Sequence, residues 1–80
     1  MNEKKVSVYS TSSCPYCRML KDFLDANSVS YESFDVGADA AKREEMMNKS
    51  GQMGVPVTDI DGKIIIGFDK EAIREELGIK

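Results

Sequence analysis

Residues 6–27 read VSVYSTSSCPYCRMLKDFLDAN and carry the pattern that decides the fold. The segment opens with alternating β-forming residues, which predict a strand at about residues 4–9. A polar loop follows, and Pro15 then stands where the first turn of a helix favours proline. Beyond it, apolar side chains recur at three- and four-residue spacing, which predicts an amphipathic helix ending near Asn27. The two cysteines, Cys14 and Cys17, therefore lie where a strand passes into a helix.

The rest of the chain predicts five more elements. Each of the two later helices follows an aspartate that suits an N-cap and precedes a glycine that suits a C-cap. The last two strands are joined by Asp61-Gly62, a strong signal for a two-residue hairpin turn. The predicted elements are a strand at 31–36, a helix at 40–49, strands at 55–60 and 63–66, and a helix at 71–77.

This order of elements, β-α-β-α-β-β-α, defines an α/β fold class. The first two strands with the helix between them form a βαβ unit, so they are expected to be parallel with a right-handed crossover. The last two strands form an antiparallel hairpin. A four-stranded mixed sheet with three helices follows, and 80 residues leave room for a single domain spanning residues 1–80.

Composition and charge exclude several classes of function. The apolar fraction of 41% and the charged fraction of 31% are ordinary for a soluble globular protein. The net charge of −3 comes without a basic cluster, which argues against a nucleic-acid partner. The longest aliphatic run is Ile64-Ile65-Ile66, far short of the roughly 18–20 residues that span a bilayer, and the first residues lack the apolar core of a signal peptide. We therefore expect no membrane association and a cytoplasmic protein.

The spacing of the two cysteines points to chemistry rather than to stabilisation. A bridge between Cys14 and Cys17 closes a loop too short to stabilise a fold. In a reducing compartment such a pair is catalytic or binds a metal more often than it is structural. A zinc site would need about four ligands, and this chain offers two thiols and no histidine, so it would require a dimer. Two incidental buried cysteines remain the other alternative.

The helix position assigns different roles to the two thiols. Unpaired N–H groups at a helix N-terminus favour an anion, so a cysteine held there becomes the reactive thiolate more easily. Cys14, nearer the end, is expected to be exposed and nucleophilic. Cys17, one turn further in, is expected to be more buried and to act as the resolving thiol. Arg18 is a neighbouring cation that we expect to favour the thiolate further.

Three segments together resemble the dithiol glutaredoxins. Residues 10–18, STSSCPYCR, resemble the active site of that family, Val55-Pro56 resembles its proline loop, and Gly67-Phe68-Asp69 resembles the loop before its last helix. The resemblance covers essentially the whole chain. It implies a thioredoxin fold with the strands in the order second, first, third, fourth, and with the first and third helices on one face. It also implies a cis Val55–Pro56 bond that turns the backbone of Val55 toward Cys14.

The resemblance further implies a metal-free thiol–disulfide oxidoreductase without a bound cofactor, with glutathione as co-substrate. The family's substrate- and glutathione-binding positions correspond to Thr11, Tyr16, Val55, Pro56, Gly67, Phe68 and Asp69. The chain departs from the family pattern where a base is common (Thr11), where threonine precedes Val-Pro (Gly54), and where a second glycine is common (Phe68). Gly67-Phe68 is similar to small redoxins that serve ribonucleotide reductase. The electron donor is therefore expected to be either glutathione or a thioredoxin reductase.

The expected partners are disulfide-containing proteins, which a monomer would reduce. A different function remains open: an iron–sulfur cluster carrier that holds its cluster between two subunits through Cys14 and glutathione, or a redox sensor module. Pro15 and Cys17 argue against the carrier, because the proline stiffens the loop and the second thiol competes for the first.

Overall fold

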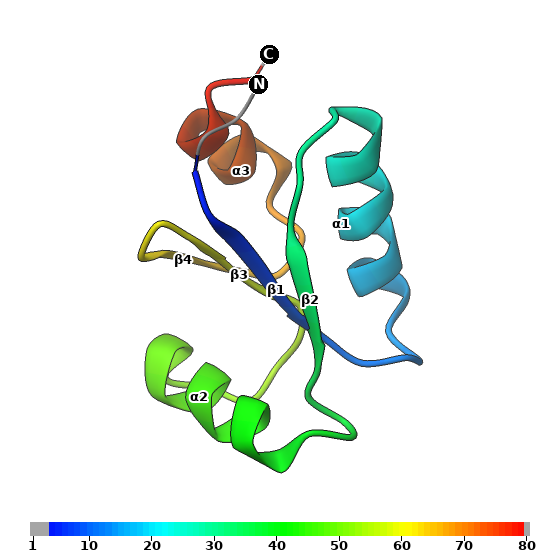
Figure 1. Cartoon of the computed structure of the whole chain (residues 1–80), viewed down its shortest axis with the longest axis vertical. Coiled ribbons are helices and arrows are strands. Elements are labelled where there is room, and N and C mark those ends of the chain that lie inside the picture. The colour runs from blue at the N-terminus through cyan, green and yellow to red at the C-terminus, as the bar shows by residue number, and fades with distance from the viewer. Residues whose placement is uncertain (1–3, 80) are drawn as a thin grey trace.

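The structure is a computed structural model that describes residues 4–79. It contains the seven elements in the expected order (Figure 1). They are β1 (Val6–Ser10), α1 (Pro15–Ala26), β2 (Glu32–Asp35), α2 (Ala40–Ser50), β3 (Val57–Ile60), β4 (Lys63–Ile66) and α3 (Lys70–Leu77). None of the helices within the described range is both long and apolar enough to cross a membrane.

The four strands form one mixed sheet in the order β2-β1-β3-β4. The strand β1 pairs in parallel with β2 and antiparallel with β3, and β3 pairs antiparallel with β4. This topology confirms the expected thioredoxin fold. The register places Tyr9 opposite Val57 and Val57 opposite Ile66. The last residues of β1 and β4 and the first residues of β3 therefore lie at the same end of the sheet.

The two faces of the sheet carry separate cores. Alternating residues of β1 point to opposite faces, so Val6 and Val8 join one core and Tyr9 joins the other. The first core includes Leu20 and Leu24 of α1 with Ile73 of α3, and the second includes Met46 of α2. As expected, α1 and α3 share a face, and α2 covers the opposite one (Figure 1).

Local chemistry explains where the later helices begin and end. The Asp39 and Asp69 carboxylates accept hydrogen bonds from the backbone N–H groups of Lys42 and Ala72, which satisfies donors that the first helical turn leaves unpaired. The helices α2 and α3 end at glycines whose φ angles of +74° and +69° are left-handed. The hairpin turn at Asp61-Gly62 has positive φ at both residues, as a two-residue turn of this type requires.

Three strand predictions differ from the structure. The second strand, Glu32–Asp35, is one residue shorter at each end than predicted. The first strand begins at Val6 and includes Ser10, whose carbonyl accepts from the N–H of Val36 at 2.9 Å. The third strand begins at Val57 instead of residue 55. Proline has no N–H to donate to a strand ladder, and the Val55–Pro56 bond is cis, as the resemblance implied.

Candidate active site

The loops that hold the predicted site residues lie at the same end of the sheet. The strand β1 leads through Thr11 to Cys14, Pro56 precedes β3, and Gly67 follows β4. The Gly67 N–H donates to the Pro56 carbonyl at 2.8 Å, so the second and third of these loops are directly hydrogen-bonded. The sheet topology therefore gathers sequence-distant segments around the start of α1.

Cys14 is the N-cap of α1. Its backbone is extended, and its Sγ accepts a hydrogen bond from the N–H of Cys17 at 3.1 Å. The residue is half-buried, and neither cysteine forms a disulfide. A sulfur at this position lies at the helix end whose backbone N–H groups are left without helical partners. The structure thus places Cys14 where a nucleophile is expected.

Cys17 lies one turn deeper and only 1% of its surface is exposed. Burial, followed by its contact with Cys14, raises the pKa of the Cys17 thiol to about 11. The Cys14 charge also raises this pKa, whereas hydrogen bonding with the Thr11 backbone and the positive charge of Lys21 lower it. In the dithiol form Cys17 is therefore protonated at neutral pH. Cys14, in contrast, occupies the N-cap position of the helix.

Two cationic residues of α1, Arg18 and Lys21, follow the cysteines in sequence. Arg18 is exposed, and within residues 4–79 its side chain makes no hydrogen bond or ion pair with either cysteine. Its predicted effect on Cys14 remains a prediction. Lys21 stands four residues after Cys17 on the same helix face and acts on that thiol, a role that sequence reasoning missed although the i, i+4 spacing could have signalled it.

The segment before the cis proline is held by its own side chain. The Gln52 amide donates to the Gly54 carbonyl at 3.0 Å and accepts from the Gly54 N–H at 2.7 Å. A Cβ at residue 54 would lie 2.6 Å from the Gln52 Oε1. The family commonly has threonine at this position. Here glycine leaves room for the two hydrogen bonds that the Gln52 side chain makes with the residue 54 backbone. Pro56 is buried and Val55 packs against the core beneath α2.

The loop after β4 uses its three predicted residues in different ways. Gly67 has a φ of +78° and supports the hydrogen bond to Pro56. Phe68 turns toward the core between α1 and α3, where its ring meets the Phe23 ring edge-on at a centroid distance of 6.0 Å. The Asp69 Oδ1 accepts from the Ala72 N–H at 3.2 Å and so caps α3.

The remaining predicted residues stand on the surface of the site. The Tyr16 side chain is 62% exposed, between the two cysteines in sequence. Thr11 is half-buried beside Gly37, and a Cβ added there would lie 3.6 Å from the Thr11 Cγ2. Within residues 4–79, no group of three or more His, Cys, Asp or Glu side chains is placed to hold a metal ion.

Known proteins match this chain along most of its length. The glutaredoxin family model matches residues 6–65. A glutaredoxin-like 8.6 kDa protein in the rubredoxin operon of Clostridium pasteurianum is 43% identical over 68 residues, covering 85% of this chain and 91% of the relative. Glutaredoxin 3 of Escherichia coli K12 is 41% identical over 64 residues, covering 80% of this chain and 77% of the relative.

A solved structure has the same fold over most of the chain. A variant of the thioredoxin-like protein BC3987 superposes with a TM-score of 0.90 at 38% identity, covering 95% of this chain and 97% of that one. The family match spans the strand that leads to Cys14, the helix that holds both thiols and the proline loop. The chain belongs to the glutaredoxin family of thiol–disulfide oxidoreductases.

Proposed function

We propose that this chain reduces protein disulfides and glutathione mixed disulfides through Cys14 and Cys17. The Cys14 thiolate attacks one sulfur of the substrate disulfide, and the other sulfur leaves as a thiolate. Cys17 then loses its proton and attacks the Cys14 Sγ, which releases the second substrate sulfur and leaves a Cys14–Cys17 disulfide. Two electrons pass from the dithiol to the substrate, and the thiolates released take up protons.

The observation that carries this proposal is the shared geometry of the two sulfurs at the start of α1. The Cys14 Sγ accepts the Cys17 N–H at 3.1 Å, so the resolving residue already lies beside the nucleophile. The Cys14 charge is one cause of the raised Cys17 pKa, after burial. Forming the mixed disulfide removes that charge, which makes Cys17 easier to deprotonate. The first step therefore prepares the second.

Glutathione is proposed as co-substrate, with weak binding. Its carboxylates need cationic or N–H partners, and Thr11 supplies no charge. Gly54 supplies no hydroxyl, and the Asp69 carboxylate already accepts from Ala72. The backbone of Val55 remains available to pair with an extended substrate, as in strand addition. A well-formed charge-assisted hydrogen bond contributes roughly 1.5–3 kcal/mol to the binding free energy, and less in an exposed groove. Each such contact that is missing weakens glutathione binding accordingly.

The oxidised protein needs a thiol reductant to complete the cycle. We propose that either two glutathione molecules or a thioredoxin reductase supplies the two electrons, in a reducing compartment such as the cytoplasm. Cys17 supports a true dithiol cycle because its sulfur is buried next to Cys14 and is ready to close the intramolecular disulfide.

A coupled disulfide-reduction assay tests the proposal. The wild type is assayed on a protein disulfide and on a glutathione mixed disulfide, with either glutathione plus glutathione reductase or thioredoxin reductase as donor. Cys14→Ser should abolish activity on both substrates, because it removes the attacking thiolate. Cys17→Ser should abolish activity on the protein disulfide and retain activity on the mixed disulfide, since a second glutathione resolves that intermediate.

Ser13→Ala is the matched control, because it changes an exposed hydroxyl beside Cys14 and leaves both sulfurs in place. It should retain activity on both substrates. Equal residual activity of the two cysteine variants on the protein disulfide would overturn the assignment of roles, and an inactive wild type with both donors would overturn the function itself.

A further inference from the structure

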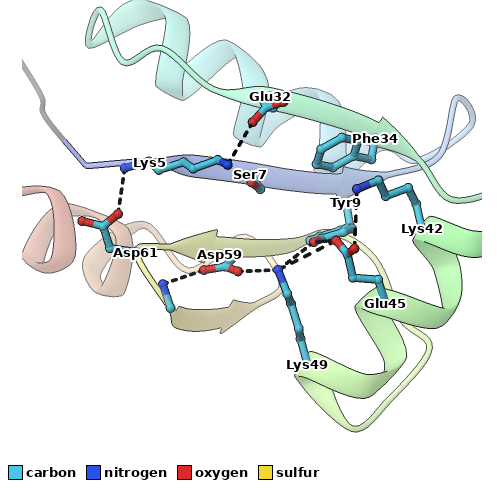
Figure 2. A pocket seen from close by; sticks show the side chains of 11 residues that line it. Lys5, Ser7, Tyr9, Glu32, Phe34, Lys42, Glu45, Lys49, Asp59 and Asp61 are labelled. Atoms are coloured by element: carbon cyan, nitrogen blue, oxygen red, sulfur yellow. Dashed lines mark hydrogen bonds and ion pairs between the residues drawn. The ribbon is translucent and has the colours of Figure 1, made fainter.

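A polar cavity of about 400 Å³ opens beside α2, on the face of the sheet away from α1 and α3 (Figure 2). Lys49 of α2 reaches across it to two strands. Its Nζ donates to the Asp59 Oδ2 at 2.7 Å and to the Tyr9 hydroxyl at 3.0 Å. We name Tyr9, Lys49 and Asp59 the lysine brace. One ammonium group therefore joins three elements, β1, α2 and β3.

The lysine brace spans the segment that contains the cis proline. Lys49 is the second-last residue of α2, and Asp59 is the third residue of β3. The two residues are ten positions apart, and their ion pair closes a loop with Val55–Pro56 inside it. The ends of this loop are thus fixed to each other by a side-chain contact as well as by the sheet.

Tyr9 connects the same ammonium group to the strand that leads to Cys14. Its side chain is fully buried, and its hydroxyl donates to the Glu45 carboxylate while it accepts from Lys49. The Tyr9 ring belongs to the core against which Val55 packs. One residue later, Ser10 ends β1 and the active-site loop begins. The lysine brace therefore contacts the bases of both loops that the proposed reaction uses.

The contacts of Lys49 are expected to affect the placement of the neighbouring segments more than the free energy of unfolding. Hydrogen bonds to Asp59 and then to Tyr9 raise the pKa of Lys49, which keeps the ammonium charged throughout the physiological range. The Lys49 side chain is 36% exposed, and ion pairs this exposed contribute little to the free energy of unfolding. A substrate-binding segment that is less firmly held, in contrast, loses affinity for its substrate, because ordering the segment then costs free energy on binding.

We propose that Lys49 is a positioning residue for disulfide exchange, which holds the Val55–Pro56 segment in place relative to β1, the strand that leads to Cys14. This inference rests on the proposed function and adds a residue outside the segments that the sequence marked. Lys49 touches neither the substrate nor the sulfurs. It acts through Asp59 and Tyr9, and its loss is expected to weaken substrate binding without changing the intrinsic reactivity of Cys14.

The test compares Lys49→Met with Lys42→Met. Both variants remove one ammonium group from the cavity rim, but Lys42 forms its ion pair with Glu45 of its own helix, at 3.5 Å, and lies over the Phe34 ring. KM and kcat are measured on a glutathionylated peptide, and the rate of Cys14 alkylation by iodoacetamide is measured separately. Lys49→Met should raise KM about fivefold or more and leave kcat and alkylation within about twofold. Lys42→Met should leave all three within about twofold.

Two further variants separate positioning from a general loss of structure. Lys49→Arg should restore KM to within about twofold of the wild type, because a guanidinium can reach the same two acceptors. Asp59→Asn, which breaks the lysine brace from its other end, should raise KM as Lys49→Met does. Circular dichroism at the assay temperature confirms that each variant is folded before its kinetics are compared.

The outcomes distinguish this inference from the proposed function. An unchanged KM in a folded Lys49→Met protein overturns the positioning role. A fall in the alkylation rate as large as the rise in KM also overturns it, because the Cys14 loop itself would then have changed. If Lys49→Met does not fold, an unchanged KM in Asp59→Asn overturns the inference instead. A wild type that fails to reduce the glutathionylated peptide overturns the function on which the inference rests.

Discussion

The two faces of the sheet are built on different principles. The face under α1 and α3 holds eight buried apolar residues with further aromatic side chains around them, and it encloses the resolving thiol. The face under α2 holds four buried residues and borders a cavity crossed by ion pairs (Figure 2). Apolar contacts are non-directional, whereas hydrogen bonds and ion pairs fix distances and angles. The first face therefore supplies stability and a low-dielectric site, and the second supplies geometry.

Removing a large buried side chain from each face gives the largest contrast. Leu24→Ala should lower the free energy of unfolding by about 3–4 kcal/mol, because two helices close the core around the cavity that it leaves. Met46→Ala should lower it by about 2 kcal/mol, because a single helix beside solvent relaxes more easily. Urea unfolding measures both values. Equal losses would contradict the view that only one face carries most of the stability.

The apolar face also controls the titration of the resolving thiol. Burial is the largest cause of the raised pKa of Cys17 and persists in the Cys14 mixed disulfide, so the thiolate fraction of Cys17 rises about tenfold per pH unit below that pKa. Release of a protein substrate from its Cys14 mixed disulfide should therefore accelerate steadily between pH 6 and pH 8. Stopped-flow measurement of the single-turnover rate checks this. In Cys17→Ser, resolution by added glutathione should follow the titration of glutathione instead, and a flat wild-type profile would argue against resolution by Cys17.

The polar face should show a smaller effect, on stability, in a more acidic pH range. Burial raises the pKa of Asp59, but hydrogen bonds from Lys49 and from the Gly62 backbone outweigh it and hold the pKa below the usual range. Its contribution to stability is therefore present above about pH 4 and lost as pH falls through the lowered pKa. Asp59→Asn, which keeps an oxygen for Gly62, should lower the free energy of unfolding by about 1 kcal/mol at pH 7 and by almost nothing near pH 2. A constant difference between these pH values would exclude this charge as the cause.

Local signals explain why so much of the fold could be predicted from the sequence. Asp39 and Asp69 cap helices through bonds to residues three positions away, and Asp61-Gly62 forms its turn from its own dihedral preferences. The cysteine spacing and the start of α1 are local too. Each of these features is determined within about one turn of chain, so the order of residues carries it.

Features that depend on distant contacts could not be predicted in this way. The Tyr9–Lys49 contact joins residues 40 positions apart, and neither residue has a local pattern that names its partner. Whether Phe68 faces the substrate groove or the core depends on Phe23, on a different helix. The Gly67 N–H that donates to the Pro56 carbonyl likewise comes from a loop at the far end of the hairpin.

The sulfur that attacks the substrate is also the acceptor that begins α1. In the oxidised protein this sulfur is bonded to the Cys17 sulfur and is a weaker acceptor, so the first helical turn loses a cap worth about 1 kcal/mol. Because that cap exists only in the dithiol form, the same free energy enters the redox equilibrium. With 30 mV corresponding to about 1.4 kcal/mol for two electrons, capping raises the reduction potential by about 20 mV. The hydrogen bond from the Cys17 N–H to the Cys14 Sγ thus affects both the fraying of the first turn of α1 and the reduction potential. Hydrogen exchange at the Cys17 amide, compared between the reduced and oxidised protein, measures this contact.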